Sequence, residues 1–275
     1  MPPRQSGSRK APWVGAFFLL LGWQQTALAG SCARPAATEP VLVRYVPDGD
    51  TVVLANNRKI RLIGINTPET RQDDQPAQAL AIEARDRLRR LLFTQGNKAQ
   101  ALYGLAEKDR HGRYLAHLWL ADGTNLAAEL LRNGLGWVVA IPPNTRFLDC
   151  YIESERMARD AASGVWGHRD HAARTSTQLN LRSRGFQRVT GRVVRVNHGG
   201  GATWINLEGR FAVRIPDQDL RWFDHPPDSS WIGTELKVRG WLYAAKGELR
   251  VTVRHPAALE LKVNGAAGPT PVYNP

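Results

Sequence analysis

Residues 41–65 have the sequence VLVRYVPDGDTVVLANNRKIRLIGI, and this stretch decides the fold of the first half of the chain. Its runs of Val, Ile and Leu are interrupted by Pro-Asp-Gly-Asp at 47–50 and by Asn-Asn at 56–57, which are residues that favour tight turns. The alternation of apolar runs and turns predicts an antiparallel meander. We expect its strands at 41–46, 51–54 and 59–65.

The residues that follow predict three helices and two more strands. Pro76 can open a helix that ends before Gly96. Strands are expected at 99–105 and 114–120, and helices at 125–133 and 147–162. Together these elements predict an α+β, mainly β domain over 41–167, in which a small curled sheet carries about three helices. Apolar residues recur at helical spacing in the first helix, namely Leu80, Ala84, Leu88, Leu91 and Leu92.

A change of composition at 168–185 separates this domain from a second one. The segment is rich in Arg, His, Ser and Thr and has little periodicity, so we interpret it as a basic linker. Residues 186–263 again contain short apolar runs between Gly and Asp turns, which suits a compact β-barrel. The tail at 264–275 is expected to be flexible. Strands of the second barrel are expected at 189–196, 202–207, 211–215, 235–243 and 249–255.

The chain is strongly basic, and its first residues are typical of a secretory signal. It has 37 Lys and Arg against 25 Asp and Glu, a formal net charge of +12. Three basic residues precede an apolar run that is too short for a membrane span, and small residues follow up to Ala29. This predicts a signal peptide at 1–29, an N-terminal segment at 30–40, and export to the periplasm or the medium. The exported chain keeps a charge of 34 − 25 = +9 and would attract polyanions.

The two cysteines allow two interpretations. Outside the cytosol Cys32 and Cys150 can form a disulfide that spans 150 − 32 = 118 residues. Alternatively, cleavage just before Cys32 would make that residue a lipid anchor, although Ala29, Gly30 and Ser31 match such a site poorly. The exported context favours the disulfide. With 43% hydrophobic residues and only two cysteines, the chain is neither disordered throughout nor a small disulfide scaffold.

Three motifs place acidic and basic residues at the ends of expected strands. Strands of this length fold back on one another, so the acidic clusters could meet and offer the oxygen ligands that Ca²⁺ prefers. Arg61 and Arg113 would add guanidinium groups, which bind phosphate oxygens. A metal, two arginines and a spare carboxylate are sufficient for phosphodiester hydrolysis. The motifs are Asp48-Gly49-Asp50-Thr51, Arg61-Leu62-Ile63-Gly64-Ile65-Asn66-Thr67-Pro68-Glu69 and Asp109-Arg110-His111-Gly112-Arg113.

Each motif alone has a simpler structural explanation. Asp-Gly pairs are common in hairpins, and Thr67-Pro68-Glu69 could cap a helix or shape a loop. Single arginines such as Arg61 and Arg113 are commonly exposed or engaged in surface ion pairs. A catalytic site is therefore indicated only by the combination of the motifs and by their order.

In combination and order, the motifs resemble the staphylococcal thermonuclease family over 41–167. Further matches lie at Asn125-Leu126-Ala127, Gly134-Leu135 and Gly164-Val165-Trp166. The resemblance implies a monomeric nuclease with a five-stranded barrel of OB type and three helices, which cleaves DNA and RNA with Ca²⁺. The second barrel is similar to small OB-like modules that follow this nuclease domain in other exported bacterial proteins.

The resemblance also implies a role for each site residue. Asp50 and Asn66 would bind the metal through their side chains and Thr67 through its main-chain carbonyl. Glu69 would orient or deprotonate the attacking water. Arg61 and Arg113 would hold the phosphoryl oxygens and offset the negative charge of the transition state.

Two stretches depart from the pattern of the family. Asn66 stands where many members have a second aspartate, so Ca²⁺ should bind more weakly. Ala140 and Ile141-Pro142 stand where some members carry tyrosines that contact a base, so a preference for DNA or RNA does not carry over.

Two other functions stay open at this point. One is a non-catalytic nucleic-acid-binding or interaction protein on a degenerate nuclease domain, which Asn66 supports and the retention of Arg61, Glu69 and Arg113 opposes. The other is a protein that binds anionic polymers of the cell envelope through its positive charge. The role of the aromatic residues of the second barrel also stays open. They could fill its core or stack on bases of a single strand, and the first role is favoured.

Overall fold

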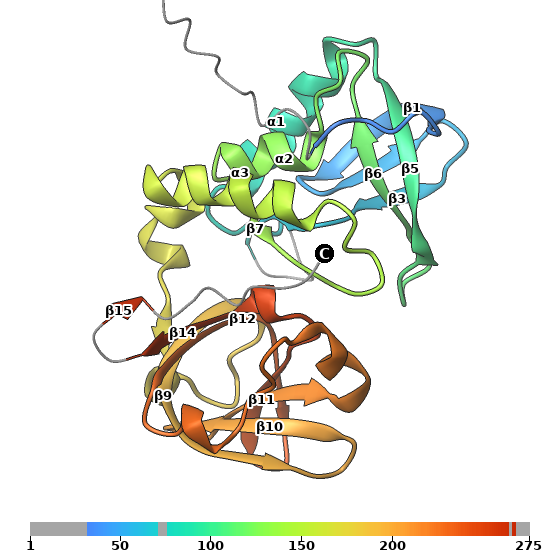
Figure 1. The fold of residues 1–275 in the computed structure, drawn as a ribbon. Helices are drawn as coiled ribbons and strands as arrows, with labels where there is room; N and C mark the ends of the chain where they lie inside the picture. The colour runs from blue at the N-terminus through green and yellow to red at the C-terminus, as the bar shows by residue number, and fades with distance from the viewer. Residues whose placement is uncertain (1–31, 71–75, 264–265, 268–275) are drawn as a thin grey trace, which may run out of the picture.

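The computed structural model describes residues 32–70, 76–263 and 266–267, and shows two barrels in succession. Figure 1 shows three helices beside the N-terminal barrel and the C-terminal barrel below them. The predicted signal peptide at 1–29 and most of the predicted tail lie outside the described residues. The predicted fold, mainly β with two small barrels and about three α-helices, is confirmed.

Five strands close the N-terminal barrel in the order β1-β2-β3-β6-β5. Neighbours are antiparallel except β3 and β6, which run parallel with Arg61 opposite Leu115. This order, with a helix before the fourth strand of the barrel, is that of an OB-fold. The strands are β1 (Glu39–Asp48), β2 (Thr51–Leu54), β3 (Lys59–Leu62), β5 (Lys98–Lys108) and β6 (Tyr114–Trp119).

The expected single strand at 59–65 is divided in two, and this division shapes the site. Gly64 has φ +89°, a backbone conformation that glycine adopts most easily, and it turns the chain after β3. The following β4 (Ile65–Asn66) leaves the barrel and pairs with β7 (Trp137–Val138) as a separate two-stranded sheet. The spacing of apolar residues in the sequence at 59–65 gives no sign of this break.

The α-helices are α1 (Ala81–Phe93), α2 (Leu126–Arg132) and α3 (Leu148–Asp160). Helix α1 begins five residues later than Pro76, because Leu80 takes a left-handed conformation with φ 65° and so interrupts the helical path. Its buried face is the predicted one and includes Ala84, Leu88 and Leu92. Helix α2 starts with a hydrogen bond from the backbone N–H of Ala128 to the Asn125 side chain at 3.0 Å.

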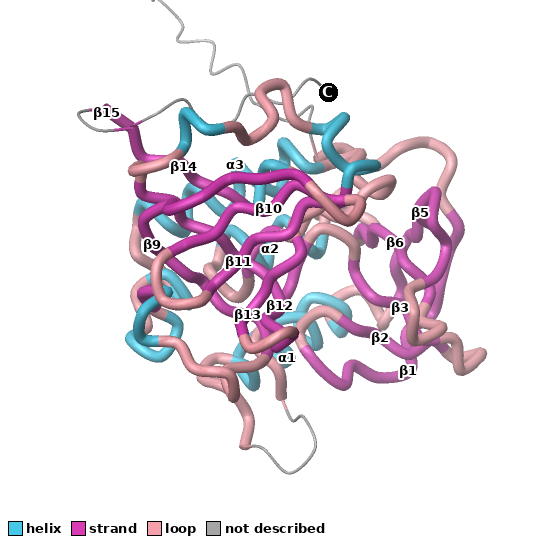
Figure 2. The backbone as a smooth tube through the Cα atoms, turned by 90° about the horizontal axis from the view of Figure 1, so that it is seen from below, coloured by secondary structure: helices cyan, strands magenta, loops and turns pink. Residues whose placement is uncertain are grey.

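The C-terminal barrel repeats the topology of the first one. Its strands follow the order β9-β10-β11-β13-β12, and pairing of β12 with β9 closes the ring. As in the N-terminal barrel, the third and fifth strands, β11 and β13, are parallel. Figure 2 shows these strands from below. They are β9 (Gly185–His198), β10 (Ala202–Leu207), β11 (Phe211–Pro216), β12 (Glu235–Ala245) and β13 (Glu248–Thr252).

Part of the segment predicted as a linker packs on the C-terminal barrel. Its β8 (Arg174–Thr175) pairs with β9, and Leu179 joins the core of that barrel. The described part of the predicted tail includes β15 (Ala266–Ala267), which pairs with β14 (Leu259–Val263). Among the described helices, none is both long and apolar enough to cross a membrane.

The two barrels are joined by a buried ion pair and by stacked rings. Arg239 of β12 lies 2.7 Å from a carboxylate oxygen of Glu155 on α3, and both side chains are about one-tenth exposed. The same carboxylate accepts a hydrogen bond from the backbone N–H of Val138 at 2.6 Å. Beside it, the ring of Trp137 stacks on Phe186 with centroids 5.2 Å apart. Strand β7 therefore contacts β4 on one side and the C-terminal barrel on the other.

A disulfide joins Cys32 to Cys150 of α3, which is the first of the two interpretations of these cysteines. The carbonyl of Cys32 accepts a hydrogen bond from the indole of Trp119 at 2.9 Å. The N-terminal segment is thus attached to the core of the first barrel by a covalent bond and a partly buried hydrogen bond.

Replacing both cysteines by serine should lower the free energy of unfolding by about 4 to 5 kcal/mol, the loop-entropy effect for a ring of this size. Urea unfolding followed by circular dichroism measures this difference. Wild type with a reductant should behave like the variant. An unchanged midpoint would show that the bond does not constrain the unfolded chain.

Substitution Arg239→Ala should destabilise the protein by about 3–5 kcal/mol, because it leaves the buried Glu155 carboxylate without its cation. Arg159→Ala is the matched control, since Arg159 also joins α3 to the second barrel, through Glu260, but both partners are 39% exposed. The control should cost about 1 kcal/mol or less. Equal losses in urea unfolding would contradict the distinction.

Candidate active site

The turn between β1 and β2 places two carboxylates side by side. The backbone N–H of Asp50 donates to Asp48 Oδ1 at 3.1 Å, which fixes the turn. Asp50 is buried, and its Oδ2 accepts hydrogen bonds from the backbone N–H of Thr67 at 2.8 Å and from the Thr67 hydroxyl at 3.1 Å. Burial and the Asp50 carboxylate together raise the pKa of Asp48 to about 6. Negative charge is therefore concentrated at this turn.

Gly49 allows the acidic turn to approach its neighbours. A Cβ atom at this position would lie 2.7 Å from Cβ of Ala84 on α1 and 2.8 Å from the Thr67 hydroxyl oxygen. Such distances are far below van der Waals contact, so any other residue would displace the turn. Glycine at this position thus serves the close packing of the site as well as the hairpin.

Arg61, on β3, forms the ion pair at the centre of the site. Its Nη2 lies 2.9 Å from Asp50 Oδ2 and donates to Asn66 Oδ1 at 3.1 Å. Its Nη1 donates to the carbonyls of Leu62 at 3.0 Å and Ile65 at 2.7 Å. With only 11% of the side chain exposed, these partners hold the guanidinium in one orientation.

Strand β7 supports the segment that contains Asn66 and Thr67. Both residues are buried, and Asn66 pairs with Trp137 in the two-stranded sheet. Gly136 makes the pairing possible, because a Cβ atom there would lie 2.6 Å from the carbonyl oxygen of Asn66. The amide of Asn66 also lies 3.4 Å from the carbonyl oxygen of Thr67. Side-chain and main-chain oxygens of these two residues are therefore adjacent.

Glu69 follows directly and is held through its backbone by Gln78. The N–H of Glu69 donates to Gln78 Oε1 at 3.0 Å, and the N–H of Gln78 donates to the Glu69 carbonyl at 2.9 Å. Burial raises the pKa of Glu69 to about 7, and the charges of Asp50 and Asp48 act in the same direction. Glu69 is thus a carboxylate near two others, in a partly desolvated position.

Arg113 reaches the same region from the turn at 109–113. Its Nε lies 2.7 Å from Asp109 Oδ2, and its side chain is 30% exposed. The charges of Arg61 and Arg113 both lower the pKa of Glu69 and so oppose the effect of burial. The two arginines therefore act electrostatically on one carboxylate, although Arg113 makes its ion pair with Asp109.

The structure therefore brings the predicted site residues together on one part of the N-terminal barrel. Asp50, Arg61, Asn66 and Thr67 form one hydrogen-bonded cluster. Glu69 lies within the electrostatic reach of that cluster and of Arg113. The roles of these residues stay predictions, because a position alone does not show what a residue does.

The donor set fits a hard cation such as Ca²⁺. In the described parts of the chain, no three His, Cys, Asp or Glu side chains converge to hold a metal by themselves. Amide and main-chain oxygens would have to contribute, as those of Asn66 and Thr67 could beside Asp50. Burial is the main cause of the raised pKa values of Asp48 and Glu69, and repulsion by neighbouring carboxylates raises them further. A divalent ion would offset that repulsion.

Two supporting residues could not be found from the sequence. Gln78 lies nine residues from Glu69 and belongs to no recognisable motif. Gly136 lies four residues after the end of α2, just past Gly134 at the helix end, and no motif marks it. Only the tertiary structure shows that these residues hold Glu69 and Asn66.

The sequence that forms this site is similar to known proteins. Residues 59–168 match the family described as Staphylococcal nuclease homologue. The chain is 30% identical over 131 residues to a thermonuclease of Staphylococcus intermedius, which covers 46% of this chain and 76% of that protein. It is 33% identical over 127 residues to a thermonuclease of Staphylococcus hyicus, with 45% and 73% covered. Endonuclease YhcR of Bacillus subtilis is 26% identical over 155 residues, with 52% and 13% covered.

Substitution Asn66→Asp should tighten Ca²⁺ binding by about tenfold or more, because it adds a charged oxygen ligand beside Asp50. Isothermal titration calorimetry with Ca²⁺ alone measures this without catalysis. Asn56→Asp is the control, since it adds the same charge at an exposed turn of the same barrel. An unchanged affinity in Asn66→Asp would show that position 66 does not contact the ion.

Proposed function

The chain belongs to the staphylococcal nuclease family, and on this basis we propose that it is an exported, Ca²⁺-dependent nuclease that cleaves DNA, RNA or both. The enzyme class follows from the family: it is a hydrolase that acts on phosphodiester bonds. The metal requirement, the export and the residue roles are the parts proposed. We propose that the nuclease is an endonuclease and acts as a monomer.

The observation that carries the proposal is the convergence of opposite charges on one small region. Arg61 touches both Asp50 and Asn66, and Glu69 lies near this cluster and near Arg113. Phosphodiester hydrolysis concentrates negative charge on the phosphoryl oxygens in the transition state. Groups fixed in advance to stabilise that charge supply a large part of the rate acceleration.

Each residue then has a defined task. Asp50, Asn66 and the carbonyl of Thr67 would hold Ca²⁺, which when bound neutralises charge on the substrate phosphate. Arg61 and Arg113 donate hydrogen bonds to phosphoryl oxygens, and Asp50 and Asp109 orient the two guanidinium groups. Glu69, in its ionised form, orients or deprotonates the attacking water.

Export rests on the basic and apolar start of the chain and is supported by the disulfide. Cys32 and Cys150 are bonded in the structure, and such bonds persist mainly in oxidising compartments. The positive charge of +9 that remains after removal of 1–29 suits a protein that meets nucleic acid outside the cell.

A second candidate function is nucleic-acid binding without turnover. Asn66 favours it, because an amide offers the ion no negative charge and Arg61 already donates to its oxygen. The chain keeps Arg61, Glu69 and Arg113, and the charges of both arginines act on Glu69, which opposes a role in binding alone. Cleavage by wild type decides between the two.

The mature protein should cleave denatured DNA, plasmid DNA or RNA in the presence of Ca²⁺, and a chelator should abolish the cleavage. Glu69→Gln and Arg113→Ala should each lower kcat by about 10²- to 10³-fold, because each removes a group that acts in the transition state. Gel electrophoresis and initial rates provide the measurement.

Arg110→Ala is the matched control for Arg113→Ala. Arg110 lies in the same turn and carries the same charge, but its side chain is exposed and hydrogen-bonded to His111. Its rate should stay within about twofold of wild type. Absence of cleavage by wild type over a wide range of Ca²⁺ would contradict the enzymatic proposal.

A further inference from the structure

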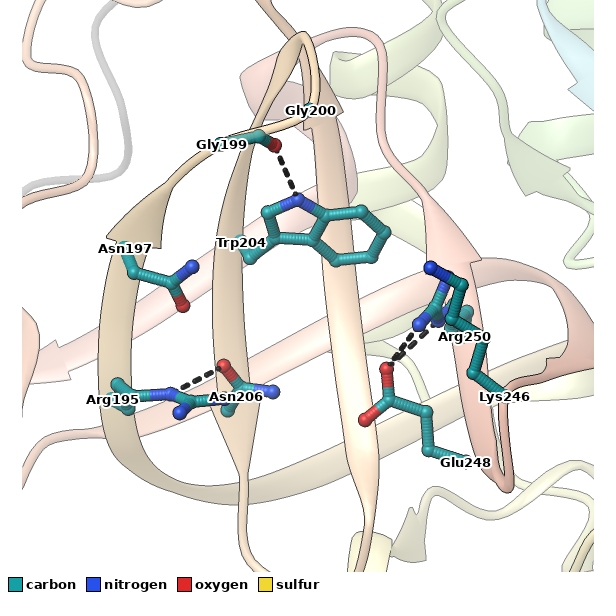
Figure 3. Close-up of a pocket in the computed structure, with 9 residues that line it drawn as sticks. All are labelled: Arg195, Asn197, Gly199, Gly200, Trp204, Asn206, Lys246, Glu248 and Arg250. Carbon is teal, nitrogen blue, oxygen red and sulfur yellow. Dashed lines mark hydrogen bonds and ion pairs between the residues drawn. The ribbon is translucent and has the colours of Figure 1, made fainter.

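The C-terminal barrel carries a groove on its outer face, remote from the residues described above. The groove has a volume of about 370 Å³ and is formed by β9, β10 and β13 with the loops β9–β10 and β12–β13. Figure 3 shows its side chains. We name it the Trp204 groove, and the lining residues used below are Arg195, Trp204, Asn206, Lys246, Glu248 and Arg250.

Trp204 lies on the outer side of its strand and does not fill the core. Along β10, Thr203, Ile205 and Leu207 are buried, whereas Trp204 and Asn206 alternate with them and are partly exposed. The barrel therefore fills its interior with the first set, and the indole of Trp204 contributes to the surface. Phe211 and Phe223, in contrast, are buried in the core, and Trp222 and Trp231 are partly buried against it, so the favoured core interpretation holds for only part of the barrel's aromatic residues.

The indole of Trp204 is fixed in position. Its Nε1 donates to the carbonyl of Gly199 at 3.0 Å, which ties the ring to the β9–β10 loop. The guanidinium of Arg250 lies 4.6 Å from the ring centroid, and that of Arg214 lies 5.9 Å from it. Because both guanidinium groups lie over the ring, a flat ring would stack on the part of the indole that they leave exposed.

Positive charge predominates around this ring. Arg195 and Lys246 are exposed, and Arg250 completes three cations in the groove. The one acidic lining residue, Glu248, is 2.7 Å from Arg250 Nη2 and orients that guanidinium. Arg195 donates to Asn206 across the strand pair at 3.2 Å. The net charge is positive, which attracts phosphate groups and gives no such advantage to a neutral sugar.

The loop next to Trp204 leaves the groove open. It contains Gly199, Gly200 and Gly201, and a Cβ atom at any of them would meet no other atom within 4 Å. Gly200 and Gly201 have positive φ, which lets the loop turn without side chains that would cover the indole. The groove is therefore accessible to an extended polymer.

We propose that the Trp204 groove binds single-stranded nucleic acid, with one base stacked on Trp204 and neighbouring phosphates paired with Arg195 and Lys246. In OB-folds, oligonucleotides and oligosaccharides bind at the face of the second and third strands, between the first and fourth loops. The groove lies at this face. A single strand is inferred because only unpaired bases expose a face for stacking.

The groove lies apart from the proposed catalytic residues. Figure 1 shows β10 at the lower side of the C-terminal barrel, with the helices of the N-terminal barrel above that barrel. Binding there would hold a long strand close to the enzyme between cleavage events, as a second attachment point. The inference does not depend on catalysis, because binding can be measured without Ca²⁺.

The test uses the full mature chain with a fluorescein-labelled oligothymidylate and an excess of chelator, so that no cleavage occurs. Fluorescence anisotropy should show that Trp204→Ala weakens binding at least fivefold and that Trp204→Phe, which keeps a stacking ring, weakens it less. Binding should quench tryptophan fluorescence in wild type, and Trp204→Phe should lose a measurable part of the quench although six other tryptophans remain in the mature chain.

Charge variants keep the test decisive if Trp204→Ala folds poorly. Arg195→Glu and Lys246→Glu alter exposed residues and should each weaken binding several-fold, whereas Arg192→Glu, on the same strand outside the groove, should weaken it less. Three results would overturn the proposal. The first is an unchanged affinity and an unchanged quench in both Trp204→Phe and Trp204→Ala, and the second is an equal loss of affinity in Arg192→Glu and Arg195→Glu. The third is binding of a neutral oligosaccharide, but not of the oligothymidylate, at this groove.

Discussion

The buried ion pair between Arg61 and Asp50 is the interaction on which the proposed site depends. Two charges removed from water are tolerated only when each is paired and hydrogen-bonded. Here the guanidinium also binds Asn66 and two main-chain carbonyls, and the carboxylate also binds Thr67. The pair therefore joins the β1–β2 turn, β3 and β4, which are separate along the chain. Any metal or phosphate chemistry at this site must use groups that the ion pair has already brought together.

The same arrangement links the site to the second barrel. Asn66 pairs with Trp137 of β7, and Trp137 stacks on Phe186 at the start of β9. The next residue, Val138, donates to Glu155, whose carboxylate pairs with Arg239 of β12. The C-terminal barrel thus supports Asn66 through β7. This structural role is separate from the proposed binding of substrate at its outer face.

Much of this was predictable from the sequence, and the exceptions have physical causes. Apolar runs and turn residues predicted most of the strands, and the motif order predicted which residues gather at the site. The break at Gly64 was not predictable, because Arg61 to Ile65 keeps the composition of one strand while a single positive φ redirects it. Gln78 and Gly136 were missed because their contacts with Glu69 and Asn66 are tertiary. Trp204 could not be separated from the core aromatics until the register of β10 showed which residues face outward.

A crystal structure of the mature protein with Ca²⁺ and a short oligonucleotide tests the central claim most directly. We expect one ion within about 2.3–2.6 Å of oxygens of Asp50, Asn66 and Thr67. We also expect Arg61 and Arg113 to contact the same phosphate, with Glu69 beside it. A structure in which the phosphate lies elsewhere, while Arg61 and Arg113 keep only their ion pairs with Asp50 and Asp109, would contradict that claim.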